Sequence, residues 1–92
     1  MIFAQVIGTV VSTVKDPNLN GKKLLLCRET DHEGRPQASY HVAVDAVGAG
    51  EGTLVLLSYG SSARMTETTK DAPIDAVVMA IVDGVRITHE VA

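Results

Sequence analysis

The sequence has no tryptophan and few aromatic residues of any kind, since Phe3, Tyr40 and Tyr59 make up 3% of the chain. Basic residues are also scarce: eight lysines and arginines stand against eleven aspartates and glutamates, for a net charge of −3. Proteins that bind single-stranded nucleic acid commonly stack bases on aromatic rings above a basic groove. The shortage of both residue types therefore argues against a nucleic-acid partner.

Cysteine and long apolar segments are scarce as well. Cys27 is the only cysteine, so an internal disulfide is impossible, and its apolar neighbours predict a small buried side chain rather than a reactive thiol. The longest wholly apolar run covers residues 76–82, whereas a membrane-spanning helix needs about 20 residues. No secretion signal is recognisable in the sequence. These features predict a protein of the reducing cytoplasm without a membrane partner.

The chain has 92 residues, of which 46% are hydrophobic, and this predicts one folded domain over residues 1–92. Valine, isoleucine and threonine are abundant, and their β-branched side chains favour strands. Gly8, within the first apolar segment, predicts a bulge or a sharp bend. The pattern predicts an all-β fold with one short helix: strands over 2–14, 22–30, 37–44, 53–59 and 74–83, a further short strand over 85–89, and a helix that Ser61 or Ser62 caps and that ends near Thr69.

Three of the expected strands, 22–30, 53–59 and 74–83, are apolar on both faces. In a small antiparallel barrel one face fills the interior and the other meets water, so these strands need a second cover. The sequence predicts that other copies of the chain supply this cover by symmetric self-association. The alternative is a monomeric barrel with an unusually apolar exterior.

Motifs for catalysis or cofactor binding are weak throughout the chain. The loop Gly48-Ala49-Gly50-Glu51-Gly52 has Thr53 where a dinucleotide fingerprint needs its third glycine, and a strand follows where a helix should. The segment Gly60-Ser61-Ser62-Ala63-Arg64 ends in arginine where a nucleophile elbow requires glycine. The histidines, His32, His41 and His89, lack metal-ligand spacing. We therefore expect no catalytic residue, no cofactor and no metal.

Five main strands and one short helix predict a small OB-like β-barrel. Because many such barrels bind oligonucleotides, an alternative function is the binding of single-stranded nucleic acid or a small ligand. That function requires aromatic residues beside basic residues on one barrel face, and the sequence lacks this combination.

Several segments together carry a family resemblance. They are Ile7–Thr13 (IGTVVST) with Lys22–Leu26 (KKLLL), Ala43–Gly52 (AVDAVGAGEG), and Gly60–Arg64 (GSSAR) with Pro73–Ala76 (PIDA) and Ile81–Asp83 (IVD). In this order and spacing they resemble the vertex proteins of bacterial microcompartment shells, a family that includes the carboxysome and ethanolamine-utilisation vertex proteins. The resemblance covers about residues 1–84. Each segment alone is weakly informative, whereas the combination is specific.

The resemblance implies a small OB-like barrel that assembles as a cyclic homopentamer and occupies the five-fold vertices of a polyhedral shell. It implies a structural protein rather than an enzyme, located in a microcompartment shell in the cytoplasm. The implied partners are the hexameric or trimeric proteins of the shell facets. On this interpretation residues 1–84 form the barrel core and residues 85–92 a C-terminal strand or tail. The resemblance does not separate a carbon-fixing compartment from a catabolic one.

The resemblance also implies where the subunits meet. The two glycine-containing loops are expected at or near the five-fold axis or the subunit interface. Arg64 is expected to form an interface ion pair or hydrogen bonds to backbone carbonyls, because its planar guanidinium suits both; the alternative is a solvated charge. The complete expected set is Gly48, Ala49, Gly50, Glu51, Gly52, Gly60, Ser61, Ser62, Ala63, Arg64 and Asp75.

Overall fold

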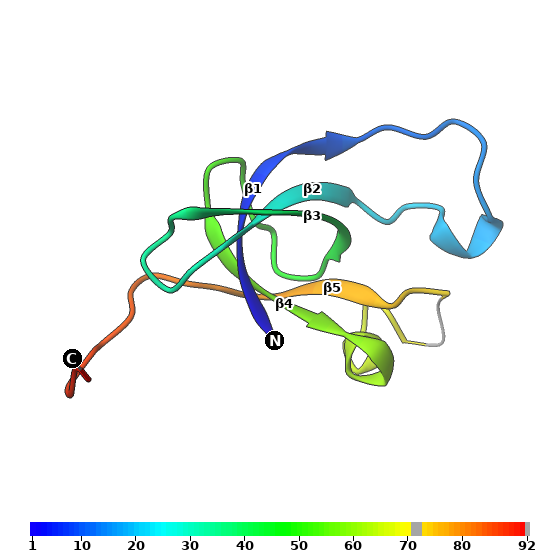
Figure 1. Cartoon of the computed structure of the whole chain (residues 1–92). Coiled ribbons are helices and arrows are strands. Elements are labelled where there is room, and N and C mark those ends of the chain that lie inside the picture. The colour runs from blue at the N-terminus through cyan, green and yellow to red at the C-terminus, as the bar shows by residue number, and fades with distance from the viewer. Residues whose placement is uncertain (71–72, 92) are drawn as a thin grey trace.

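The computed structural model describes residues 1–70 and 73–91, and their strands close into a small barrel (Figure 1). The elements are β1 (Ile2–Val10), η1 (Pro17–Leu19), β2 (Leu24–Thr30), β3 (Pro36–Asp45), β4 (Leu54–Tyr59), η2 (Gly60–Arg64) and β5 (Ala76–Ile81), where η denotes a 3₁₀ helix. The predicted fold class, a five-stranded all-β barrel with a short helix after β4, is confirmed, and η1 is an additional 3₁₀ turn that was not predicted.

The strands follow the order β1-β2-β3-β5-β4 around the closed barrel. β1 pairs antiparallel with both β2 and β4, so it serves both halves of the barrel. Its register against β2 shifts between Val6 and Gly8, which confirms the irregularity predicted at Gly8. A short parallel contact between β3 and β5, Val44 with Val77 and Asp45 with Val78, closes the barrel. This arrangement is that of an OB-like barrel.

Several strand ends differ from the sequence prediction. β1 ends at Val10 rather than Val14, because β2 begins at Leu24, opposite Val10, and the chain beyond has no strand beside it. Val11 and Val14 are accordingly 86% and 91% exposed. β5 ends at Ile81, and residues 82–91 form no strand, so the strand predicted over 85–89 is absent from the single chain. The other ends shift by only one or two residues.

The predicted helix is shorter than expected and has a different start. η2 has only five residues, and it follows Tyr59, whose side chain makes no capping hydrogen bond. Ser61 and Ser62 lie inside η2, so the prediction that one of them is the cap is wrong. The first residue is Gly60, with a positive φ of 69° that turns the chain sharply out of β4. The break predicted at residues 71–73 lies largely outside the described residues.

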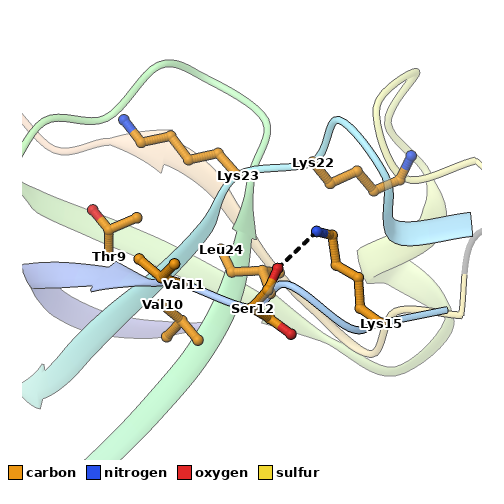
Figure 2. A pocket seen from close by; sticks show the side chains of 8 residues that line it. All are labelled: Thr9, Val10, Val11, Ser12, Lys15, Lys22, Lys23 and Leu24. Carbon is orange, nitrogen blue, oxygen red and sulfur yellow. Dashed lines mark hydrogen bonds between the residues drawn. The ribbon is translucent and has the colours of Figure 1, made fainter. Parts of the chain in front are cut away.

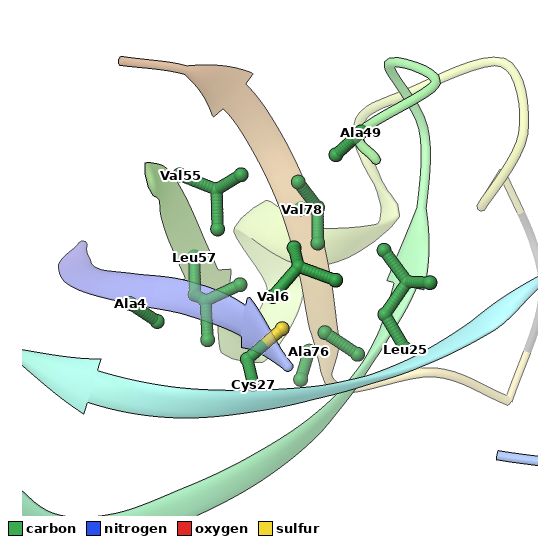
Figure 3. Packing of buried hydrophobic residues seen from close by; sticks show 10 residues of the cluster. Ala4, Val6, Leu25, Cys27, Ala49, Val55, Leu57, Ala76 and Val78 are labelled. Atoms are coloured by element: carbon green, nitrogen blue, oxygen red, sulfur yellow. The ribbon is translucent and has the colours of Figure 1, made fainter. Parts of the chain in front are cut away.

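Small and medium-sized side chains fill the barrel (Figure 3). Cys27 has no exposed surface, which confirms the prediction of a buried side chain. A narrow barrel has room for alanine and valine beside only a few leucines, and such a core depends on close packing. The cluster consists of Ala4, Val6, Leu25, Cys27, Ala43, Ala49, Val55, Leu57, Ala76 and Val78.

The strands that are apolar on both faces fall into two groups. At the start of β5, Ala76, Val77 and Val78 are all buried within the single chain, and η2 packs against this strand. The segment between β4 and β5, which contains η2, therefore covers this part of β5, where the sequence predicted a second copy of the chain. β2 and β4 instead alternate between buried and half-buried positions. Their outer leucines remain partly exposed: Leu24, Leu26, Leu54 and Leu56.

Candidate subunit interface

The loop between β3 and β4 contains the first group of expected interface residues, Gly48–Gly52, and Asp45 organises its start. The Oδ1 atom of Asp45 accepts hydrogen bonds from the backbone N–H groups of Val47, Gly48 and Ala49, at 3.0, 3.0 and 3.2 Å. Gly48 has a φ of 75°, a conformation that side chains disfavour. One carboxylate thus fixes three consecutive backbone groups and sets the direction of the loop.

The end of the same loop is tied to β1. The N–H of Gly52 donates to the carbonyl oxygen of Val6 at 2.7 Å, and the N–H of Val6 donates to the carbonyl oxygen of Thr53 at 3.0 Å. Ala49 turns inward and is buried in the barrel core, where Figure 3 shows it beside Val78. Gly50 and Glu51 are exposed. The loop is therefore an ordered element with one inward face and one face available to a neighbour.

η2 and the residues before β5 form the second group. The N–H of Gly60 donates to the carbonyl oxygen of Asp75 at 3.0 Å, and Nη1 of Arg64 donates to the carbonyl oxygen of Ile74 at 3.1 Å. Ala63, within η2, is fully buried. Arg64 thus bonds to a backbone carbonyl, one of the two roles expected for it, and does so within its own chain. The remainder of its planar guanidinium stays available for a second acceptor.

The two groups lie at opposite ends of β4. The glycine-rich loop leads into Leu54 and η2 leaves from Tyr59, so the six-residue strand separates them by about 17–20 Å. The structure brings Gly60, Arg64 and Asp75 together and keeps Gly48–Gly52 apart from them. Both groups can belong to one interface that runs along β4, but they do not form a single cluster. Their place at an interface or an axis remains a prediction.

One pocket beside the barrel is lined by three lysines. The pocket in Figure 2, of about 250 Å³, lies where the chain leaves β1 and enters β2, and Lys15, Lys22 and Lys23 line it together with apolar residues. The Lys15 ammonium donates to the backbone carbonyl oxygen of Ser12 at 3.0 Å, while Lys22 and Lys23 extend in opposite directions. The three charges therefore do not converge on one bound anion.

No helix in the described part of the chain is long and apolar enough to cross a membrane.

Sequence analysis missed one cluster of polar side chains. Nε2 of His41 lies 2.9 Å from Oε1 of Glu29, and Nδ1 of His41 meets the hydroxyl of Tyr59. Burial, followed by the negative charge of Asp75, raises the pKa of Tyr59. Both ring nitrogens of His41 are engaged, so neither is free for a metal or a substrate. The pairing of His41 with Cys27 across β2 and β3 would have placed Glu29 nearby, but the approach of Tyr59 needs the closed barrel.

Replacing Asp45 with alanine is expected to destabilise the glycine-rich loop by about 1–2 kcal/mol, because three backbone N–H groups lose their common acceptor. Hydrogen exchange of the Val47, Gly48 and Ala49 amides measures this loss directly. The control is Asp45→Asn, which keeps an oxygen acceptor at the same place. Equal protection in Asp45→Ala and in the unaltered chain would show that the carboxylate does not hold the loop.

The fold and the site define a small OB-like barrel whose ordered loops and partly exposed outer leucines suit assembly with other chains. Within the described residues, no three histidine, cysteine, aspartate or glutamate side chains are grouped as metal ligands would be. The chain belongs to the EutN/CcmL family: the family model described as ethanolamine utilisation protein EutN/carboxysome matches residues 1–83.

Relatives share most of their length with this chain. It is 49% identical over 87 residues to the carboxysome shell vertex protein CcmL of Synechocystis sp., covering 95% of this chain and 87% of that protein. It is 52% identical over 87 residues to the bacterial microcompartment shell vertex protein PduN of Salmonella typhimurium, covering 90% and 96%. The solved GrpN pentameric microcompartment shell protein from Rhodospirillum rubrum superposes with a TM-score of 0.84 at 46% identity, covering 95% of this chain and 100% of that chain.

These findings confirm the resemblance found in the sequence. They also confirm the expected role as a microcompartment shell vertex protein and its expected place in the shell. They favour this role over the alternative of a barrel that binds single-stranded nucleic acid.

Proposed function

We propose that this chain assembles as a cyclic homopentamer that caps the five-fold vertices of a bacterial microcompartment shell. The observation that carries the proposal is the match to the GrpN pentameric shell protein over 95% of the chain. The partly exposed leucines on the outer faces of β2 and β4 support it, because a ring of five copies covers apolar surface that one barrel leaves open. A head-to-tail contact of two different patches closes into a ring when the rotation per subunit is correct.

Within this ring, the interface contains the two groups at the ends of β4. The exposed face of Gly48–Gly52 offers backbone groups that a neighbouring chain can approach closely, since glycines leave room for a second backbone. Arg64, which bonds to the carbonyl oxygen of Ile74, and Asp75, the residue after Ile74, provide the charged part of the contact. Both groups flank one strand, so a single neighbouring subunit lying along β4 can touch both.

The proposed partners outside the ring are the hexameric or trimeric proteins of the shell facets, and nucleic acid is not among the partners. The protein is also proposed to have no catalytic activity of its own. The structure supports this through His41, whose two ring nitrogens are occupied by Glu29 and Tyr59. The chain's role is then geometric: it supplies the five-fold points that allow flat six-fold facets to close into a shell.

Native mass spectrometry of the purified chain tests the ring. The expected species has a mass of about 48 kDa, five times the 9.7 kDa chain. A species of about 10 kDa at micromolar concentration would contradict the proposal, and any other defined oligomer would contradict its stoichiometry. Co-expression with facet proteins of the same source then tests vertex closure, with open shells expected when this chain is omitted.

Replacing Arg64 with alanine is expected to weaken the ring about tenfold while leaving the barrel folded, because an exposed arginine at a subunit contact adds more to assembly than to the core. The pentamer-to-monomer midpoint on dilution measures the effect, and far-ultraviolet circular dichroism checks the fold. Lys70→Ala, which removes an exposed charge from the same connection, is the control. Unchanged assembly in Arg64→Ala would show that Arg64 takes no part in the subunit contact.

A further inference from the structure

The C-terminal residues 83–91 are exposed along their whole length. They follow β5, form no regular structure, and end away from the barrel, as Figure 1 shows. Their side chains nevertheless alternate as in a strand: Val85, Ile87 and Val91 share one side, with His89 between the last two, and the three apolar side chains are 43%, 49% and 82% exposed. A segment that has the pattern of a strand but no partner strand in its own chain has backbone N–H and C=O groups that can pair with another strand.

The same chain also has an unpaired strand edge. β3 is ten residues long, but on the side away from β2 it pairs with β5 only at Val44 and Asp45. In the described parts of the chain, no strand lies beside residues 37–43 on that side. An exposed edge of this length is a template for another strand. Two apolar side chains on it, Tyr40 and Val42, are 55% and 49% exposed.

We propose that residues 85–91 of one subunit pair as an added strand with residues 37–43 of β3 in the neighbouring subunit of the ring. The inference rests on the proposed pentamer, because it requires a second copy. The two segments have equal lengths, and each has one mainly apolar side, so their pairing forms an apolar strip that only His89 interrupts. Residues 37–43 contain no aspartate, glutamate, lysine or arginine, so Arg86 and Glu90 of the tail meet no like charge there.

A second copy is the occupant that the geometry favours. Each subunit has one tail and, at residues 37–43, a free edge of matching length, so in a closed ring every tail can pair with the β3 edge of its neighbour. The contact differs from the one along β4, because β3 lies on the far side of β5 from β4 in the barrel order. Each subunit would thus be joined to its neighbours both by side chains and by backbone hydrogen bonds.

Photo-crosslinking of the full-length protein tests this placement without assuming a register. A benzoylphenylalanine replaces Ile87, and equal amounts of ¹⁴N- and ¹⁵N-labelled chains are mixed and reassembled. The expected product joins the tail of one isotopic form to a peptide containing residues 37–43 of the other. Crosslinks confined to one chain, or to a different surface of a second chain, would overturn the proposal.

Backbone substitutions provide the second test. Thr88→Pro and His89→Pro each remove one N–H donor, and adjacent N–H groups point to opposite sides of a strand, so at least one variant loses a pairing bond. That variant is expected to shift the pentamer-to-monomer midpoint by about tenfold, whereas Thr88→Ala and His89→Ala are not. The tail is exposed and irregular, so the barrel remains folded. Unchanged midpoints in both proline variants would refute the tail contact but leave the ring standing, whereas a monomeric unaltered chain would refute the ring itself.

Discussion

Replacing Leu57 with alanine is expected to lower the free energy of unfolding by about 2–5 kcal/mol. Leu57 has no exposed surface and is one of only two leucines in the barrel core, the other being Leu25. The deleted methyl groups leave a cavity because the neighbouring strands hydrogen-bond to β4 on both sides and cannot collapse into it. Domains of this size are stable by about 5–15 kcal/mol, so the loss is a large share of the total.

Leu56→Ala is the matched control, since Leu56 directly precedes Leu57 in β4 and is only half-buried on the opposite face. Its cost to the barrel is expected to be smaller, about 1 kcal/mol or less. Urea unfolding followed by far-ultraviolet circular dichroism measures both variants, because the chain has no tryptophan for fluorescence. Because assembly is linked to folding and Leu56 lies on the face assigned to the ring, both variants are measured at one concentration below the pentamer-to-monomer midpoint. Equal losses in the two monomeric variants would show that the outer face of β4 is as tightly packed as the core.

The positions of the five strands along the chain and the bulge in β1 could be predicted from local pattern, because alternation and Gly8 act within a few residues. The ends of β1 and β5 could not. Val11 and Val14 continue the apolar pattern of a strand, but a strand ends where its hydrogen-bonding partner ends, and that depends on the start of β2 at Leu24. Residues 85–89 also have a strand pattern, yet they pair with no strand of their own chain in the described residues.

The candidate site also has one part that could be predicted from the sequence and one part that could not. Both loops could be recognised in the sequence from their glycines and from the family resemblance, and Asp45 and Gly60 have the geometry that tight turns require. The contact of Arg64 with Ile74 and the cluster around His41 lie beyond sequence reasoning, since each joins residues ten or more positions apart. That the two loops lie at opposite ends of β4 follows from its extended length once the strand is identified.

In the native protein, alkylation of Cys27 by iodoacetamide at pH 8 is expected to be at least about 100-fold slower than in the urea-unfolded chain. Burial, together with the negative charge of Asp45, raises the pKa of this thiol from 9.0 to about 11. The reactive species is the thiolate, and two pKa units reduce its population about 100-fold at this pH. The absence of exposed surface adds a steric barrier. Intact-mass analysis of samples quenched at intervals gives both rates, and similar rates would show that the barrel opens readily around β2.

The same raised pKa makes stability depend on pH in a defined direction. Below about pH 9 the thiol is neutral in both states, and its contribution to stability is fully present. As the pH rises from about 9 to about 11, the unfolded chain releases the proton while the folded chain retains it, so the free energy of unfolding falls. Cys27→Ala is expected to be less stable at neutral pH because it leaves a small cavity, but to decline less over this alkaline interval. Parallel declines in the two proteins would assign the alkaline loss to other groups and show that Cys27 is not held neutral in the core.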